Sequence, residues 1–187
     1  MLICLSVNSP QIHDQFREFE DLLRCDSEDK LAVWSDYINW VEQNYPEGGE
    51  EANLKKLIEN CISDLFSNTN CHQDERFFRI FLRYTRIVND ALELFNIMYT
   101  SDIFTSIAAF YVNWANVVEK NLTKAEEIIR MGLDRLAQPT IQLELALKEV
   151  QLIATENKDD ESAEEEGRCL KSMLLFITFT NLCLQFL

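Results

Sequence analysis

The chain has 187 residues, 47% of them hydrophobic, which suits one domain with a core of its own. Four glycines and three prolines leave little material for tight β-turns, so the composition disfavours an all-β fold. The formal net charge of −15 argues against nucleic acid as a partner, because phosphate contacts need a basic face.

The six cysteines are scattered and form no C-x-x-C pair. The apolar run at Met1–Leu5 is too short for a signal peptide and has no basic residues before it. We therefore expect reduced thiols in a cytoplasmic or nuclear protein.

Apolar side chains at steps of three and four residues predict a series of helices. The first begins near Gln11 and carries Phe16, Phe19, Leu22 and Leu23 on one stripe. The second covers about 30–44 and the third about 51–67. Between them, Pro46 and the glycines of Tyr45-Pro46-Glu47-Gly48-Gly49 predict a turn.

Further helices are predicted in pairs over 74–88 with 89–99, and over 101–121 with 123–137. Thr123 and Glu126 have the spacing of a capping box at the start of the last of these. A final helix runs from Pro139 to about Ala154, with a partly periodic apolar set of Ile141, Leu145, Leu147 and Leu152.

An internal repeat organises these helices. The string Tyr37-Ile38-Asn39-Trp40-Val41-Glu42 returns as Tyr111-Val112-Asn113-Trp114-Ala115-Asn116, and a weaker copy lies at Phe81-Leu82-Arg83-Tyr84-Thr85-Arg86. A mean step of about 37 residues in helical material is typical of TPR-like arrays, in which each unit buries its apolar face against its neighbours. We therefore predict an all-α fold over residues 1–156, with three helix pairs between flanking N- and C-terminal helices. Such arrays usually hold another protein.

The composition changes after Thr155. Residues 157–169 form an acidic stretch that predicts a disordered linker, and residues 170–187 are apolar with one charge, Lys171. Three interpretations of this tail stay open. It could anchor the protein in a membrane, although it is slightly short for a span. It could pack back on the array, or belong to a truncated or alternatively spliced product.

The sequence offers no support for catalysis. His72 follows Cys71, but no second pair stands at zinc-like spacing, and the other histidine, His13, is isolated. Gly48-Gly49 lacks the pattern of a phosphate-binding loop, and there is no G-x-S-x-G. We therefore expect no enzyme activity, no metal site and no cofactor.

A helix over 76–88 would align four arginines in one narrow arc: Arg76, Arg79, Arg83 and Arg86. They could grip a partner that carries carboxylates. The plainer alternative is a solvated face paired with local Asp and Glu. Apolar residues fill most of the remaining circumference and indicate core packing, with a partner helix across part of that arc as the sharper possibility.

These residues resemble the N-terminal TPR region of the BUB/MAD spindle-checkpoint proteins. The resemblance lies in the string from Trp34 through Tyr37, Ile38 and Trp40 to Gly49, in Asp74-x-Arg76-Phe77, around Ala109 to Ala115, and from Ala125 through Gly132 to Pro139. It covers about residues 16–150. It implies a three-repeat array without catalysis of its own, since the kinase or pseudokinase domain of larger members lies far downstream.

The resemblance also implies a partner, because the family's array binds a short helical motif of the KNL-type kinetochore scaffold on its second repeat. Other checkpoint proteins are further possible partners, and the expected location is the nucleus and cytoplasm, with the kinetochore in mitosis. Phe81 stands where a close relative has Trp, and Ile97 where it has Tyr, so the implied site is smaller. Its residues here are Phe81, Tyr84, Ile87, Ile97 and Met98, beside Arg79 and Arg83.

Two family features are missing: a Lys-Glu-Asn box before the array and a kinetochore-targeting segment after it. A scaffold-binding adaptor is therefore the leading hypothesis. The alternative is a membrane-tethered helical-repeat adaptor that uses residues 170–187. A helical scaffold of the RNA-processing type is a third hypothesis, which the Tyr45-to-Gly49 turn disfavours.

Overall fold

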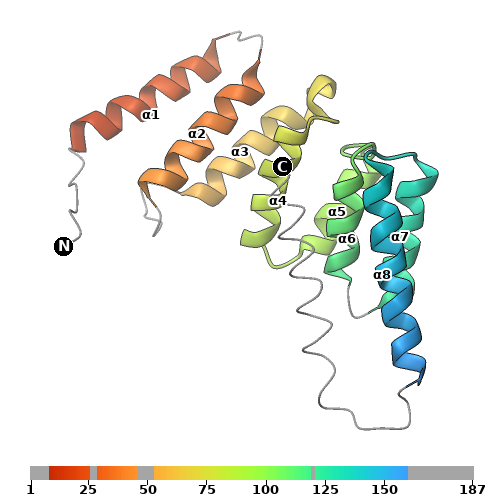
Figure 1. Cartoon of the computed structure of the whole chain (residues 1–187). Helices are drawn as coiled ribbons and strands as arrows, with labels where there is room; N and C mark the ends of the chain where they lie inside the picture. Colours follow the sequence, from red (N-terminus) through yellow and green to blue (C-terminus); the bar gives the residue numbers. More distant parts are fainter. Residues whose placement is uncertain (1–8, 26–28, 46–52, 119–120, 160–187) are drawn as a thin grey trace, which may run out of the picture. The chain divides into compact units, whose positions relative to one another are not determined.

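The computed structural model describes residues 9–25, 29–45, 53–118 and 121–159 (Figure 1). It divides into two compact units, one ending at Ile87 and the other starting at Val88. The described residues form helices and no strand; they are α1 (Ser9–Arg24), α2 (Lys30–Asn44), α3 (Leu54–Phe66), the 3-10 turn η1 (Thr69–Cys71), α4 (Glu75–Ile87), α5 (Ala91–Thr100), α6 (Ala108–Val117), α7 (Leu122–Asp134) and α8 (Thr140–Asp159). The all-helical prediction is confirmed.

The first unit holds α1 to α4. Each of its helices packs against the next, and α2 also contacts α4. Ile38 on α2, Ile58 on α3 and Phe77 on α4 have no exposed surface, and together they form the centre of this core. An aromatic cluster joins α1 to α2, with Phe16 5.0 Å from the ring of Trp40 and Phe19 stacked 4.8 Å from that of Tyr37. Of the residues predicted for the apolar stripe of α1, the two aromatic ones, Phe16 and Phe19, make these contacts with α2.

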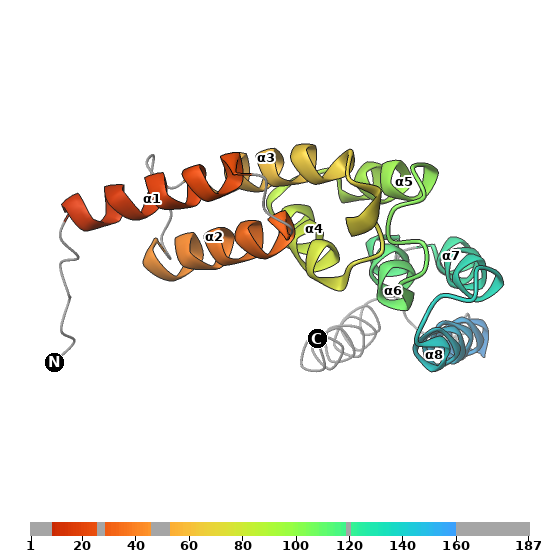
Figure 2. The same ribbon diagram turned by 90° about the horizontal axis from the view of Figure 1, so that it is seen from above.

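The second unit holds α5 to α8, and Figure 2 shows α6, α7 and α8 nearly end-on as a cluster. The central helix is α6, which packs against the other three and is buried on almost every side. Gly132 brings α7 close to it, because a Cβ at that position would lie 2.7 Å from the ring of Tyr111. Tyr111 is held in place, since its hydroxyl donates to the carbonyl of Thr105 at 2.9 Å.

Asp or Asn side chains cap four of the helices. Asp29, Asn53, Asp90 and Asn121 each accept a hydrogen bond from the backbone amide three residues on. The predicted capping box at Thr123 is therefore wrong. Asn121 is the better cap and comes two residues earlier, so Thr123 lies inside the first turn of α7.

The prediction of a helix over 101–121 is wrong in its first part. Residues 101–107 form a loop in which Asp102 and Phe104 have φ values of 58° and 63°. The side chains of Ile103 and Phe104 in this loop are buried. Such apolar residues resemble those of a helix core, which explains why the segment was predicted to be helical. A single bridge between Ile107 and Gln138 ties the loop to the chain before α8.

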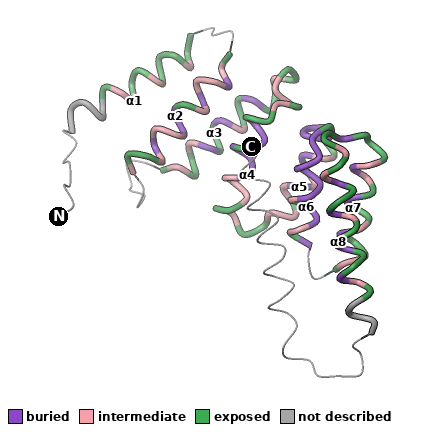
Figure 3. The backbone as a smooth tube through the Cα atoms, in the orientation of Figure 1, coloured by how far each residue is buried: buried purple, intermediate pink, exposed green. Residues whose placement is uncertain are grey.

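The inner face of α8 differs from the apolar set named in the sequence. Its buried side chains are Leu143, Ala146, Val150 and Ile153, whereas Ile141, Leu145 and Leu152 are exposed. Figure 3 shows exposed stretches recurring along this helix. The helix also continues past Ala154, to Asp159.

Several predictions fall outside the described residues: the Pro46–Gly49 turn, the predicted linker 157–169 from residue 160 onwards, and the tail 170–187. The first three residues of that linker, 157–159, are not disordered but belong to α8. In the part of the chain that the structure describes, no helix is both long and apolar enough to cross a membrane. Nor do the described His, Cys, Asp and Glu residues form a group of three placed to hold a metal ion. His72 instead lies with Nε2 2.9 Å from the carbonyl of Phe66.

Candidate partner-binding surface

The candidate surface of the first unit lies on α4, the helix with the aligned arginines. Its inner face is made of Phe77, Phe78, Ile80, Phe81 and Leu82, all buried. This face packs against α2 and α3, because a helix with so wide an apolar arc needs two neighbours to cover it. The arginines lie on the remaining face.

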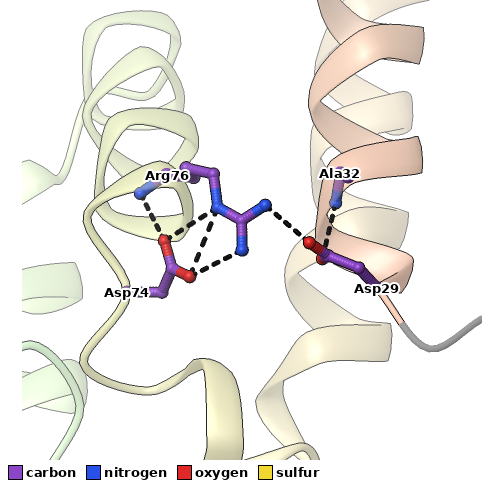
Figure 4. Close-up of polar contacts among 4 residues, drawn as sticks. All are labelled: Asp29, Ala32, Asp74 and Arg76. Atoms are coloured by element: carbon purple, nitrogen blue, oxygen red, sulfur yellow. Dashed lines mark hydrogen bonds and ion pairs between the residues drawn. The ribbon is translucent and has the colours of Figure 1, made fainter.

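Arg76 at the start of α4 is held by two carboxylates (Figure 4). Its Nη2 lies 2.9 Å from Oδ2 of Asp74, and its Nη1 lies 2.7 Å from Oδ2 of Asp29. Asp29 also caps α2 by accepting from the amide of Ala32, and Asp74 accepts from the backbone amide of Arg76. The cluster therefore joins the beginnings of two helices.

The charges of this cluster shift one another's pKa values. Hydrogen bonds from Arg76 hold the pKa of Asp29 and of Asp74 below the usual value, and the two carboxylates raise the pKa of Arg76. With its guanidinium fully engaged, Arg76 has a structural role, and the sequence hypothesis of four equivalent gripping arginines does not hold for it. In the sequence, the local feature that indicates this pairing is the Asp74-x-Arg76 spacing.

The other three arginines are held less firmly. Arg79 lies 4.0 Å from Glu75, at the limit of an ion pair, and Arg83 lies 3.4 Å from Glu42 of α2. Arg86 is exposed, and among the described residues it has no ion-pair partner. Pairing with nearby carboxylates thus accounts for part of the row of four arginines. The ion pairs of Arg79 and Arg83 are open to water.

The apolar residues expected in the site differ in exposure. Phe81 has no exposed surface and stacks on Phe78 with ring centroids 6.3 Å apart. Ile87 is 39% exposed. At about 100° per residue, Phe81 points roughly opposite to Arg83, whereas Ile87 follows Arg79 and Arg83 at steps of four residues. We call Arg79, Arg83 and Ile87 the α4 strip.

Tyr84 lies at the edge of this strip and is half-buried. Its hydroxyl donates to Oε1 of Glu59 on α3 at 3.0 Å. Burial, and after it the neighbouring Glu59 carboxylate, raises the pKa of Tyr84, so the phenol stays a neutral donor. The ring is therefore fixed beside Ile87.

The remaining predicted residues lie on α5, in the second unit. Ile97 is 41% exposed and Met98 is buried. They are consecutive on the helix, so they point about 100° apart and only Ile97 offers its side chain to solvent. Of the seven residues expected in the site, Phe81 and Met98 therefore belong to the cores of their units.

A hollow in the first unit was not expected from the sequence. It is a hollow of about 140 Å³ between α1, α2 and α3, with an aromatic and aliphatic floor and polar groups from α3; its lining is Phe16, Tyr37, Val41, Asn53, Lys56, Leu57 and Asn60. Small-molecule pockets usually exceed about 300 Å³, so this hollow has room for a single side chain. No local pattern marks it, because three helices contribute to it.

The family model for Mad3/BUB1 homology region 1 matches residues 14–133. The chain belongs to this family. The mouse mitotic checkpoint serine/threonine-protein kinase BUB1 beta is 33% identical over 169 residues, which are 85% of this chain and 16% of that protein. The fission-yeast mitotic spindle checkpoint component mad3 is 30% identical over 120 residues, 63% of this chain and 39% of that protein. The chain thus spans a minor part of the length of these relatives.

Solved structures share the fold of this Mad3/BUB1 homology region. The conserved N-terminal domain of the mitotic checkpoint component BUB1 superposes with a TM-score of 0.73, at 19% identity over 91% of this chain and 89% of that chain. A chain of the Mitotic Checkpoint Complex gives 0.74 at 23% identity, covering 87% and 80%. The helical-repeat fold and the spindle-checkpoint family expected from the sequence are confirmed.

The matched region of the family begins in α1 and ends within α7. Within it, the family-like residues Trp34, Tyr37 and Ile38 are buried in the first core, and Trp114 and Ala115 in the second. These positions are part of the two cores and so contribute to the fold. Helix α8 begins after the last matched residue.

Proposed function

We propose that this chain is a non-catalytic interaction module of the mitotic spindle checkpoint, which binds a short helical motif of a KNL-type kinetochore scaffold. The observation that carries the proposal is the α4 strip, in which exposed Ile87 continues a row of weakly paired arginines. The family relationship supports the checkpoint role. The corresponding location is the nucleus and cytoplasm, with the kinetochore in mitosis.

The strip fits a helix that presents one apolar anchor and one or two carboxylates. Ile87 with the edge of Tyr84 offers apolar contact, and Arg79 and Arg83 offer charge-assisted hydrogen bonds. The present ion pairs oppose binding only weakly, since exposed pairs contribute about 0–1 kcal/mol. A partner carboxylate can therefore replace Glu42 or Glu75 at small cost.

Phe81, Met98 and Ile97 have different parts in this proposal. Phe81 is buried in the first unit and Met98 in the second, so each is a core residue of its own unit and not a direct contact. Ile97 is exposed and is proposed as a second apolar contact on α5. A binding test by Phe81→Ala would therefore disturb the core, and Ile87→Ala is the cleaner probe.

The test is a calorimetric titration of the full chain with peptides tiled across the scaffold. A central contact contributes on the order of 2 kcal/mol, so Ile87→Ala should weaken binding about 30-fold. Leu22→Ala is the matched control, since Leu22 is similarly exposed but lies on α1. For charge, Arg83→Gln is compared with Arg24→Gln, because Arg24 is an ion-paired arginine on α1.

Binding that is lost with Ile87→Ala and Arg83→Gln, and kept in both controls, supports the proposed surface. Binding that is kept in all four variants would place the contact elsewhere on the chain, and equal loss in all four would show that the effect is not specific to the α4 strip. If no scaffold peptide binds to a helical, correctly folded protein, the partner assignment is wrong even though the family fold stands.

A further inference from the structure

The second unit carries an apolar stripe on the outside of α8, made of Ile141, Leu145 and Leu152. Their exposed fractions are 58%, 46% and 60%. Steps of four and seven residues place the three side chains within an arc of about 40°. The stripe faces away from the buried set Leu143, Ala146, Val150 and Ile153, so α8 is apolar on two sides.

A single exposed apolar side chain needs no explanation, but three in line do. A helix with apolar residues on two faces is typical of one that is covered on both. The inner face of α8 packs on α6 and α7, and the stripe has no such cover among the described helices.

We propose that the apolar segment 170–187 of the same chain packs back on the α8 stripe. This segment has one charged residue, Lys171, among eighteen, and only residues 160–169 separate it from the end of α8. Ten residues can span up to about 33 Å, and the stripe is about 17 Å long from Ile141 to Leu152. A segment of eighteen residues is long enough to cover it, either extended or as a helix of about 27 Å.

A second copy of the chain is the weaker occupant for three reasons. Tethering through a short linker gives the segment an effective concentration in the millimolar range, far above that of a separate molecule. Two copies would also bring together chains of charge −15, whereas the segment carries a single positive charge. Three side chains, moreover, fall well short of the roughly 800 Å² per partner that a stable dimer buries.

The test places a photoreactive benzophenone side chain at position 148 of the 187-residue chain. Lys148 is exposed and lies one turn from Leu145 and from Leu152, so the probe reports contact in either orientation of the segment. Mass spectrometry of the digested monomer identifies the cross-linked peptide. The matched control carries the same probe at position 93, because Glu93 is exposed on α5 of the same unit.

Cross-links from position 148 to peptides within 170–187, at least five-fold more frequent than from position 93, are expected. Leu145→Asp combined with Leu152→Asp should reduce them five-fold or more while the circular dichroism spectrum stays helical. Leu145→Gln is a milder variant that should act in the same direction. Equal cross-linking from both positions, cross-linked dimers that increase with concentration, or transfer of the segment to added liposomes with loss of the cross-link would each overturn the proposal.

Discussion

The indole nitrogen of Trp34 on α2 donates to Oδ2 of Asp64 on α3 across 2.9 Å, and this bond joins two helices at the edge of the first core. Trp114 on α6 of the second unit is also buried, but its Nε1 has no hydrogen-bond partner among the described residues. The two tryptophans therefore contribute to stability in different ways.

We predict that Trp34→Phe destabilises the protein more than Trp114→Phe does. Both substitutions lose ring surface, but only the first removes a hydrogen bond to a charged acceptor, which contributes about 1.5–3 kcal/mol. The second removes an unpaired buried donor. Urea unfolding followed by circular dichroism gives both free energies of unfolding, and equal losses would contradict the assigned roles.

Phe81→Ala should act on stability before it acts on binding. A fully buried phenylalanine typically loses about 3–5 kcal/mol on truncation, because a cavity is left behind. Ile87→Ala at the exposed end of the same helix should cost about 0.5 kcal/mol. The urea midpoints of the two variants decide this, and a near-neutral Phe81→Ala would show that the side chain is not in the core.

Gly132→Ala should destabilise the second unit although alanine favours helices. The new methyl group would meet two ring atoms of Tyr111 at 2.7 and 2.8 Å, and that ring is held by its bond to Thr105. Overpacking of this kind costs about 1–3 kcal/mol, against a gain of about 1 kcal/mol in propensity.

The matched control for this prediction is Glu127→Ala, an exposed position on α7 where no clash is expected. Combining Gly132→Ala with Tyr111→Leu should recover part of the loss, because the smaller side chain makes room. Thermal melts of the four proteins test this, and a Gly132→Ala variant as stable as the Glu127→Ala control would refute the close approach of α6 and α7.

Arg76→Gln should flatten the dependence of stability on acidic pH. Arg76 depresses the folded-state pKa of Asp29 and Asp74, so their contribution is present above the unfolded value near 3.8. It is lost as pH falls through the lower folded values. Because the cluster is largely open to water, it contributes about 0.5–1 kcal/mol at neutral pH.

Urea midpoints measured between pH 2 and pH 7 test this, with Arg24→Gln as an exposed control on α1. The two curves of wild type and Arg76→Gln should converge at the acidic end. A constant gap at every pH would mean that Arg76 acts through packing and not through charge.

The helices themselves were largely readable from local signals. The bounds 30–44 of α2 were predicted correctly, since Asp29 caps its start and the sequence places Pro46, which cannot continue a helix, two residues after its end. The loop at 101–107 was misread, because its buried Ile103 and Phe104 resemble helical core residues when only composition is considered. Positive φ values such as those in this loop are fixed by tertiary contacts and not by the local preference of the residues.

For the candidate site, the sequence showed which residues share a helix face, but it did not show how far each side chain is exposed. The row Arg79, Arg83 and Ile87 follows from spacing alone. That Arg76 is locked by Asp29 depends on a residue distant in sequence. Likewise, nothing local to α8 shows that Ala146 faces inward while Leu145 faces out.

By itself the sequence determined the helical series, the repeat and the family, because propensity, caps and apolar spacing act between near neighbours in the chain. The tertiary structure decided which apolar side chains are core and which arginines remain available, because burial and ion pairing depend on groups that only folding brings together.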